Sequence, residues 1–258
     1  MSREPRVLEE EAYAFLYQEK FDEAFGLFKK AGDAHKEKGS HKQAAICFAA
    51  AGSSWSVKCG EKTFCNAAIC YEEASREAEN AGDYEYASLL YRYAAVNYEK
   101  DMEFFNFSEC FYRSKECRRN FLTYYLLNPK KIKPITKSEE EKGLGAFLKR
   151  ILQWIALTLS CLIWGHGERP SRTLIAGISI VLLSAFLYTQ GYLSEAGVAK
   201  SPDFFDALYF SVITFSTVGY GDIVPIGFTK MVVMMESLCG MFVMSLFIVG
   251  LSRKYLRV

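Results

Sequence analysis

The stretch SPDFFDALYFSVITFSTVGYGDIVP occupies residues 201–225 and decides the fold of the second half of the chain. Its first part predicts a short helix over about residues 203–215, because the Ser201 cap, the following proline and the carboxylate of Asp203 all favour a helix start. Such a helix spans only half a bilayer. The run TVGYGD follows at 217–222, with two glycines that tolerate positive φ angles. The stretch therefore predicts a re-entrant helix and an irregular loop.

Long apolar segments flank this stretch on both sides. Residues 173–193 carry no charge, and at about 1.5 Å per residue they reach about 31 Å, enough to cross a bilayer. Residues 231–251 form a second such segment, interrupted only by Glu236. Both are predicted transmembrane helices. The apolar segment at 147–164 is shorter and carries charges between tryptophans, so it is predicted to lie in the membrane interface, with a third span as the alternative.

The basic residues are distributed consistently with two spans. They precede the first span at Lys149, Arg150, Arg169 and Arg172, and they follow the second at Arg253, Lys254 and Arg257. The positive-inside rule then predicts a multi-pass protein of the cell membrane with both termini in the cytoplasm. No apolar h-region follows the charged first residues, so no N-terminal signal peptide is predicted.

Charge divides the 258-residue chain into two dissimilar parts. Residues 1–142 hold 22 Lys/Arg and 24 Asp/Glu, whereas residues 143–258 hold 9 and 6. The net charge of +1 lacks the basic field of a nucleic-acid binder. No nucleophile with a base, phosphate loop or metal-ligand set indicates an enzyme or a bound cofactor. The eight cysteines and three histidines do not cluster at zinc spacing, which predicts reduced packing cysteines and no protein metal site.

The soluble part repeats itself at helical spacing. A small residue, an aromatic four positions later and a small residue three further on recur at Ala24/Phe28/Ala31, Ala44/Phe48/Ala51, Ala67/Tyr71/Ala74 and Ala87/Tyr91/Ala94, with a degenerate copy at Phe107/Phe111/Ser114. These offsets place the members of each copy on one helix face. Successive aromatics are 20, 23, 20 and 20 residues apart. Each unit is therefore predicted to be one helix plus a turn.

Residues 10–125 resemble the soluble NSF attachment (SNAP) proteins and tetratricopeptide (TPR) repeat proteins, on segments such as AGDAHKEKGSHKQAAICFAAAG. The resemblance implies a cytoplasmic α-solenoid over 1–128, with a generic helical bundle as the alternative. A linker is predicted at 129–146, because the residue before Pro129 is disfavoured in a helix. The interfacial helix and a turn would occupy 147–170.

Residues 172–252 resemble the two-transmembrane potassium channels, on six consecutive signature residues between two spans. The resemblance implies a pore domain of two transmembrane helices and a re-entrant pore helix at 171–258, in a chain that is all-α throughout. It also implies a homotetramer in which backbone carbonyls replace the water around K⁺. The filter would comprise Thr217, Val218, Gly219, Tyr220 and Gly221, with K⁺ held by the first four. Asp222, at the outer mouth, Ser216 and Ile213 would support it. Ile213 stands where some relatives carry a glutamate, which leaves a carboxylate brace behind the filter in doubt.

Two residues of the second apolar segment are candidates for gating. Glu236 is ionisable within a predicted span, and it resembles the glutamate that many bacterial pore-loop channels carry four residues before the inner-helix glycine. It is predicted to face either the pore helix or the cavity, or else to make a pairing that only holds the tetramer together. Gly240 matches the hinge glycine, with close helix packing as the alternative.

Three functions are compatible with these patterns. The favoured one is a potassium-selective channel, gated or assembled through its cytoplasmic repeats, with membrane lipid and a cytoplasmic protein or peptide as partners. The second is a membrane-anchored repeat scaffold with a silent pore, and the third is a weakly selective cation channel. The intact filter sequence favours the first. The sequence names no gating stimulus.

Overall fold

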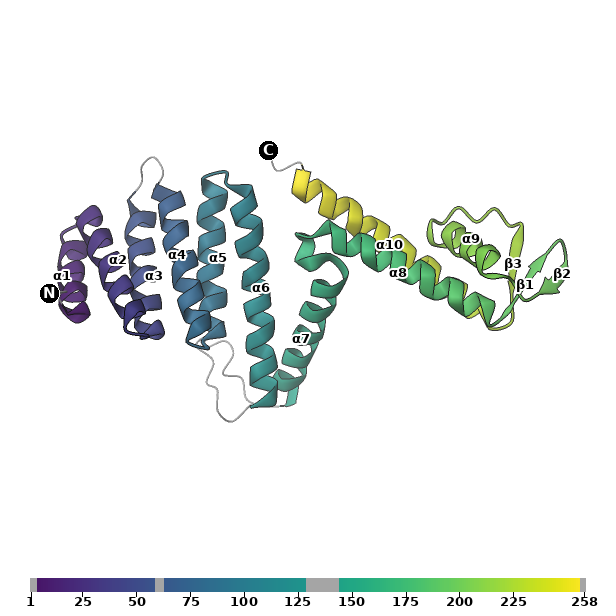
Figure 1. Ribbon diagram of the computed structural model, residues 1–258, viewed down its shortest axis with the longest axis horizontal. Helices are drawn as coiled ribbons and strands as arrows, with labels where there is room; N and C mark the ends of the chain where they lie inside the picture. The colour runs from purple at the N-terminus through teal and green to yellow at the C-terminus, as the bar shows by residue number, and fades with distance from the viewer. Residues whose placement is uncertain (1–3, 59–62, 129–143, 256–258) are drawn as a thin grey trace. The chain divides into compact units, whose positions relative to one another are not determined.

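The computed structural model describes residues 4–58, 63–128 and 144–255. It divides into two compact units, Met1–Thr158 and Leu159–Arg257 (Figure 1). Each unit has hydrophobic clusters of its own. Arg257, one of the basic residues after the second predicted span, and Cys59 lie outside the described residues.

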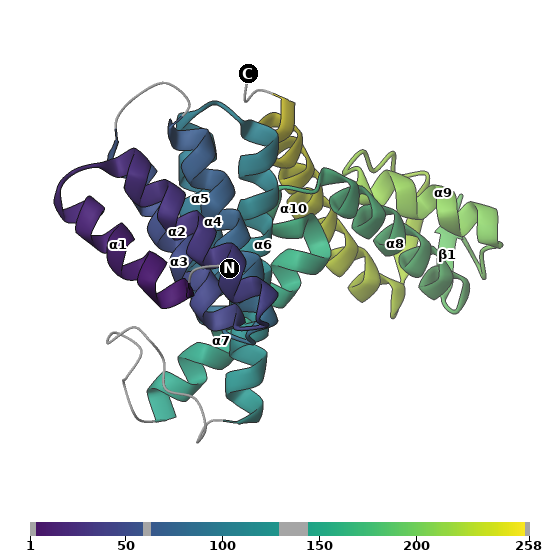
Figure 2. The same cartoon turned by 60° about the vertical axis from the view of Figure 1, so that its left-hand side comes forward.

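The first unit contains a row of antiparallel helices, each packed against the next (Figures 1 and 2). They are α1 (Pro5–Tyr17), α2 (Phe21–Glu37), α3 (His41–Val57), α4 (Thr63–Asn80), α5 (Tyr84–Lys100) and α6 (Phe104–Leu127). The five copies of the sequence pattern lie one to a helix on α2 to α6, and their members are buried except for the half-buried Phe111. The prediction of one helix per copy is confirmed, whereas α1 carries no copy.

Small residues in this row make room for the aromatic side chains of the following helix. A Cβ atom on Gly32 of α2 would lie 2.7 Å from the ring of Phe48 in α3, and one on Gly52 of α3 would lie 3.1 Å from the ring of Tyr71 in α4. Glycine inside a helix costs about 1 kcal/mol relative to alanine. Ring packing against the bare backbone offsets that cost and fixes the spacing between the helices.

The cysteines agree with the sequence prediction of unpaired packing residues. Among the described residues, none of the cysteines forms a disulfide; they lie at 47, 65, 70, 110, 117, 161 and 239. Burial raises the pKa of Cys70 and of Cys110 to about 12. These two thiols are therefore protonated at neutral pH and act as small apolar side chains.

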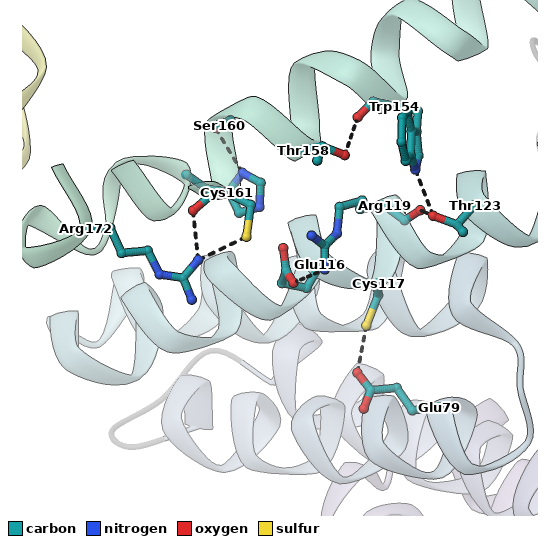
Figure 3. A network of polar contacts seen from close by, with 11 residues as sticks. Glu79, Glu116, Cys117, Arg119, Thr123, Trp154, Thr158, Ser160, Cys161 and Arg172 are labelled. Atoms are coloured by element: carbon teal, nitrogen blue, oxygen red, sulfur yellow. Dashed lines mark hydrogen bonds and ion pairs between the residues drawn. The ribbon is translucent and has the colours of Figure 1, made fainter. Parts of the chain in front are cut away.

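Helix α7 (Leu144–Trp164) begins in the first unit, where it makes polar contacts with α6. The guanidinium of Arg150 donates to the Tyr125 hydroxyl at 2.6 Å. The indole of Trp154 donates to the Thr123 hydroxyl at 2.8 Å (Figure 3). The helix starts at Leu144, so its first three residues fall within the linker predicted at 129–146, and residues 129–143 of that linker lie outside the described residues.

The second unit is built on α8 (Pro170–Thr189), α9 (Phe204–Phe215) and α10 (Thr229–Tyr255). Both α9 and α10 pack against α8, and a short 3₁₀ turn, η2 (Gly165–Gly167), precedes it. Among the described residues, three stretches are long and apolar enough to cross a membrane: Gly145–Gly167, Pro170–Thr189 and Thr229–Tyr255. The first of these stretches, Gly145–Gly167, covers the segment predicted to lie in the interface, for which a third span was the alternative.

The prediction of an all-α chain is wrong between α8 and α10. Strands β1 (Tyr192–Glu195), β2 (Val198–Lys200) and β3 (Ile223–Ile226) form an antiparallel sheet in the order β2-β1-β3. The β1–β2 hairpin turns on Ala196 and Gly197, with φ of 49° and 83°, as a two-residue turn of this hand requires. The first apolar helix consequently ends at Thr189, rather than at the predicted residue 193, because the chain has to enter β1.

Candidate functional site

Helix α9 begins on a carboxylate cap. The side chain of Asp203 accepts a hydrogen bond of 2.7 Å from the backbone N–H of Asp206. Ser201 is not the cap, contrary to the sequence prediction, and its hydroxyl instead donates to the carbonyl of Thr189 at 3.3 Å. The cap shifts to Asp203 because a carboxylate satisfies a first-turn N–H and also interacts favourably with the positive end of the helix dipole.

The chain folds back over the last turn of α9. The carbonyl of Ile213 accepts the amides of both Val218 and Gly219, at 3.0 and 3.2 Å. The Ile213 side chain is buried, and the hydroxyl of Ser216 donates to the Val212 carbonyl at 2.7 Å. The start of the TVGYG run is therefore anchored by backbone hydrogen bonds to the C-terminal end of α9. From the sequence, position 213 was notable only for carrying isoleucine where some relatives carry a glutamate.

Backbone handedness alternates along this run. Positive φ angles occur at Thr217 (58°), Gly219 (51°) and Gly221 (80°), and not at Val218 or Tyr220 between them. Alternation of this kind lets consecutive peptide carbonyls face the same side of the chain. Glycine adopts positive φ without a Cβ penalty, whereas a β-branched residue such as Thr217 does so only when its surroundings enforce it. The run is also largely exposed in the single chain.

The outer end of the run is tied back to α9. The hydroxyl of Tyr209, on the second turn of α9, donates to a carboxylate oxygen of Asp222 at 2.8 Å. Asp222 then leads into β3, where Val224 pairs with Ser194 of β1. The loop is thus fixed at both ends, by Ile213 at its start and by Tyr209 at its end.

Glu236 joins three helices inside the second unit. It lies on α10 with only 2% of its surface exposed. Its carboxylate accepts the hydroxyl of Tyr188 from α8 at 2.5 Å, and it is hydrogen-bonded to the hydroxyl of Ser211 from α9. Of the alternatives left open by the sequence, the structure has Glu236 facing α8 and α9 of its own chain. Ser211 and Tyr188 were missed, although a polar residue within an apolar helix is a signal for such a contact.

Gly240 allows α9 to contact α10 directly. The residue is buried, and a Cβ atom there would collide with the backbone carbonyl oxygen of Phe215, the last residue of α9. Close packing therefore accounts for a glycine at this position, and α10 is one continuous helix from Thr229 to Tyr255. A cavity of about 460 Å³ lies nearby between α8, α9 and α10, lined by apolar side chains such as Val181, Leu208 and Phe215.

The comparisons with known proteins concern this second unit. Residues 175–257 match the protein family described as Ion channel. The chain is 41% identical over 73 residues to the inward rectifier potassium channel Kirbac3.1 of Paramagnetospirillum magnetotacticum, covering 27% of this chain and 24% of that protein. It is 43% identical over 65 residues to the voltage-gated potassium channel Kch of Escherichia coli (strain K12), covering 24% of this chain and 15% of that protein. No solved structure matches the chain significantly.

These matches define the class of the C-terminal part. A pair of long apolar helices around a short helix and a TVGYG loop, together with the family match, supports an ion channel pore of the potassium-channel kind. The matched family is described as an ion channel and not as an enzyme. The chain covers only 24% and 15% of the length of these two relatives, and helices α1 to α6 lie outside the family match.

Proposed function

We propose that the chain is one subunit of a homotetrameric, potassium-selective channel. The observation that carries the proposal is the alternation of positive φ at Thr217, Gly219 and Gly221 directly after a half-bilayer helix. Alternating backbone is costly and has no role in a plain connecting loop. It is the conformation that a file of inward carbonyls needs.

Conduction in this proposal depends on backbone oxygens rather than on charged side chains. Carbonyls of Thr217 to Tyr220, with the Thr217 hydroxyl, replace the hydration shell of K⁺ at successive positions. One chain supplies one such loop, so a closed ring around an axial ion requires about four chains. The C-terminal end of α9 carries the negative end of its dipole, which stabilises a cation on the inner side.

Exposed apolar surface supports an assembly embedded in lipid. Side chains such as Leu182 on α8, Val212 on α9 and Met244 on α10 are about half exposed in the single chain. Exposed faces of this kind are stable only against hydrocarbon or another subunit. Neighbouring subunits and membrane lipid are the proposed occupants.

Helices α8 and α10 are the proposed spans, and α7 is the proposed interfacial helix. The support for α7 is its pair of polar contacts, from Arg150 and Trp154 to side chains of α6, because a helix that crosses the bilayer core cannot keep such contacts with a charged soluble helix. Both termini then lie in the cytoplasm. A cysteine introduced at Gln190 should react with an impermeant maleimide from outside, and one at Lys254 only from inside.

We further propose that the cytoplasmic helices α1 to α6 are TPR-like repeats that regulate opening or assist assembly, through a protein or peptide partner. Only a partner with different affinities for the open and closed channel can shift the gate. A chain lacking residues 1–128 separates the two roles. Altered open probability in a well-formed tetramer supports regulation, and normal gating with poor tetramer yield supports assembly.

A flux assay tests the channel proposal. The purified protein is reconstituted into liposomes loaded with K⁺, and the flux is compared with that of liposomes loaded with Na⁺. K⁺ and Rb⁺ should carry flux that Ba²⁺ blocks, whereas Na⁺ should not. The Gly219→Ala variant should assemble and lose the flux, because a side chain is strained at φ of 51°. A wild-type protein that assembles and passes no ion would support the silent-scaffold alternative.

A further inference from the structure

Three side chains with metal-binding atoms meet in the N-terminal helices. Glu9 lies on α1, His35 on α2 and Cys47 on α3. One ligand atom from each lies within 4.8 Å of the other two. Nε2 of His35 is 2.5 Å from a carboxylate oxygen of Glu9. The sequence did not predict this cluster, because Glu9 and His35 are 26 residues apart and belong to no zinc spacing pattern.

The packing of α1, α2 and α3 puts this cluster in an apolar setting. Cys47 is 2% exposed and lies in a hydrophobic cluster with Leu8 and Ala31. The side chain of His35 is 11% exposed and that of Glu9 is 24% exposed. The thiol is thus at the inner end of the cluster and the carboxylate at its solvent side. An ion entering from solvent would meet Glu9 first.

The donor set selects the kind of ion. One carboxylate, one imidazole and one thiolate form the mixed oxygen, nitrogen and sulfur set that Zn²⁺ takes in tetrahedral sites. Ca²⁺ and Mg²⁺ require oxygen ligands and are disfavoured by the sulfur and the nitrogen. Three protein ligands leave one position for water, which the partly exposed edge at Glu9 can supply.

Another histidine of the same helical row shows what a purely structural contact looks like. His41 lies 2.7 Å from Glu77, and Lys36 neutralises the same carboxylate at 3.3 Å. Among the described residues, no cysteine lies close enough to that pair to act as a third ligand. The cluster at Glu9, by contrast, combines three ligand types from three helices.

We propose that Glu9, His35 and Cys47 bind a Zn²⁺ ion that ties α1 to α2 and α3. Binding replaces the proton of the Cys47 thiol: the S–H bond breaks, the sulfur gives an electron pair to the metal, and the proton leaves to solvent. No electron is transferred and no other reactant is required. The inference does not depend on the channel proposal, because every ligand lies in the cytoplasmic unit.

The test uses the full-length chain in detergent, freed of metal and kept reduced, with Co²⁺ as the probe. One Co²⁺ per chain should bind and give a thiolate-to-cobalt charge-transfer band that Zn²⁺ removes by displacement. Cys47→Ser should abolish the band, and Glu9→Gln or His35→Gln should weaken Co²⁺ binding at least about tenfold, the effect of roughly 1.4 kcal/mol. X-ray absorption of the Zn²⁺ form should show one sulfur at about 2.3 Å beside nitrogen and oxygen at about 2.0–2.2 Å.

Matched variants decide between this site and any other thiol. Cys110→Ser removes another buried cysteine, and His41→Gln removes another paired histidine; both should leave the band and the affinity unchanged. The proposal is overturned by a wild-type chain that gives no charge-transfer band, or by a band that survives Cys47→Ser. If Cys47→Ser does not fold, as judged by circular dichroism, unchanged Co²⁺ affinity in both Glu9→Gln and His35→Gln overturns it.

Discussion

The hydroxyl of Tyr188 donates a hydrogen bond of 2.5 Å to the carboxylate of Glu236, across 48 residues of sequence. The same carboxylate contacts Ser211, whose hydroxyl oxygen also lies 2.9 Å from the carbonyl of Val181. One buried acid therefore links both long helices of the second unit to α9. In the proposed channel, α9 is the pore helix, so this cluster sets the position of the filter behind the permeation path.

Replacing Glu236 tests that link. Glu236→Ala leaves the buried Tyr188 hydroxyl without an acceptor, which costs about 1–3 kcal/mol, and α9 loses a fixed contact. We expect a lower melting temperature of the tetramer and a loss of potassium selectivity. Glu236→Gln should retain both properties, because an amide can accept from Tyr188 and donate to Ser211.

The control for this pair is Ser237→Ala, on the same helix, since the Ser237 hydroxyl bonds only back to Val233 of its own helix among the described contacts. The Ser237→Ala variant should have the same melting temperature and potassium selectivity as the unmodified chain. Equal selectivity and stability in Glu236→Ala and Ser237→Ala would show that the cluster does not position the filter.

Gly240→Ala should disturb the pore, whereas Gly250→Ala should not. The added methyl group on Gly240 meets the backbone carbonyl of Phe215, and at Gly250 the nearest atom is 3.5 Å away on Pro170, an ordinary contact. Overpacking costs about 1–3 kcal/mol and here displaces the end of α9. Single-channel recording should show reduced selective current for Gly240→Ala alone. Intact current with altered opening would instead indicate that Gly240 acts as a hinge.

In the proposed channel, Asp222 lies at the outer mouth and acts in two ways, through its charge and through its hydrogen bond with Tyr209. Two substitutions separate these roles. Asp222→Asn removes the charge, so conductance should fall more at 0.1 M than at 1 M salt, where the screening length shrinks from about 10 Å to about 3 Å. Tyr209→Phe keeps the charge and removes a bond worth about 0.5–1.5 kcal/mol. It should shorten openings and leave the salt dependence of conductance unchanged. An identical salt dependence in Asp222→Asn and the unmodified chain would exclude the electrostatic role.

The stability of helices α1 to α6 should depend on pH through Glu77. Burial opposes ionisation, but hydrogen bonds from His41 and Lys36 outweigh it and lower the pKa of Glu77 below its ordinary value of 4.5. Its stabilisation is therefore fully present above about pH 4.5 and is lost as pH falls through the lowered pKa. Glu77→Gln should be about 1–3 kcal/mol less stable at neutral pH, and the difference should shrink in acid. Denaturant unfolding followed by circular dichroism measures the free energy of unfolding of both proteins as a function of pH. Parallel pH curves would contradict the role of Glu77.

Local patterns predicted most of the helices. The alternation of alanine and aromatic residues identified α2 to α6, because each copy forms one face of one helix, and the TVGYG run is contiguous in sequence. The hairpin at Ala196 was missed, since a non-glycine residue with positive φ gives no sequence signal. The N-cap of α9 was predicted two residues early, at Ser201 instead of Asp203, because serine and aspartate are both good caps and only the backbone decides between them.

Contacts between distant helices were beyond the reach of sequence patterns. Ser211 and Glu236 are 25 residues apart, and Tyr188 is 48 residues from Glu236. Their contact depends on how α8, α9 and α10 pack, which periodicity within one helix does not specify. The same holds for Gly240, whose packing role depends on the end of α9. The cluster of Glu9, His35 and Cys47 is a further instance, since the sequence predicted no metal site.

The reversal potential under a K⁺/Na⁺ gradient tests potassium selectivity most directly. The purified full-length chain is incorporated into a planar bilayer with K⁺ on one side and Na⁺ on the other, at equal ionic strength. A filter built from Thr217 to Gly221 should place the reversal potential far from zero, toward the K⁺ equilibrium potential, with current that Ba²⁺ blocks. A Ba²⁺-sensitive current that reverses near zero would contradict potassium selectivity and leave a weakly selective cation pore.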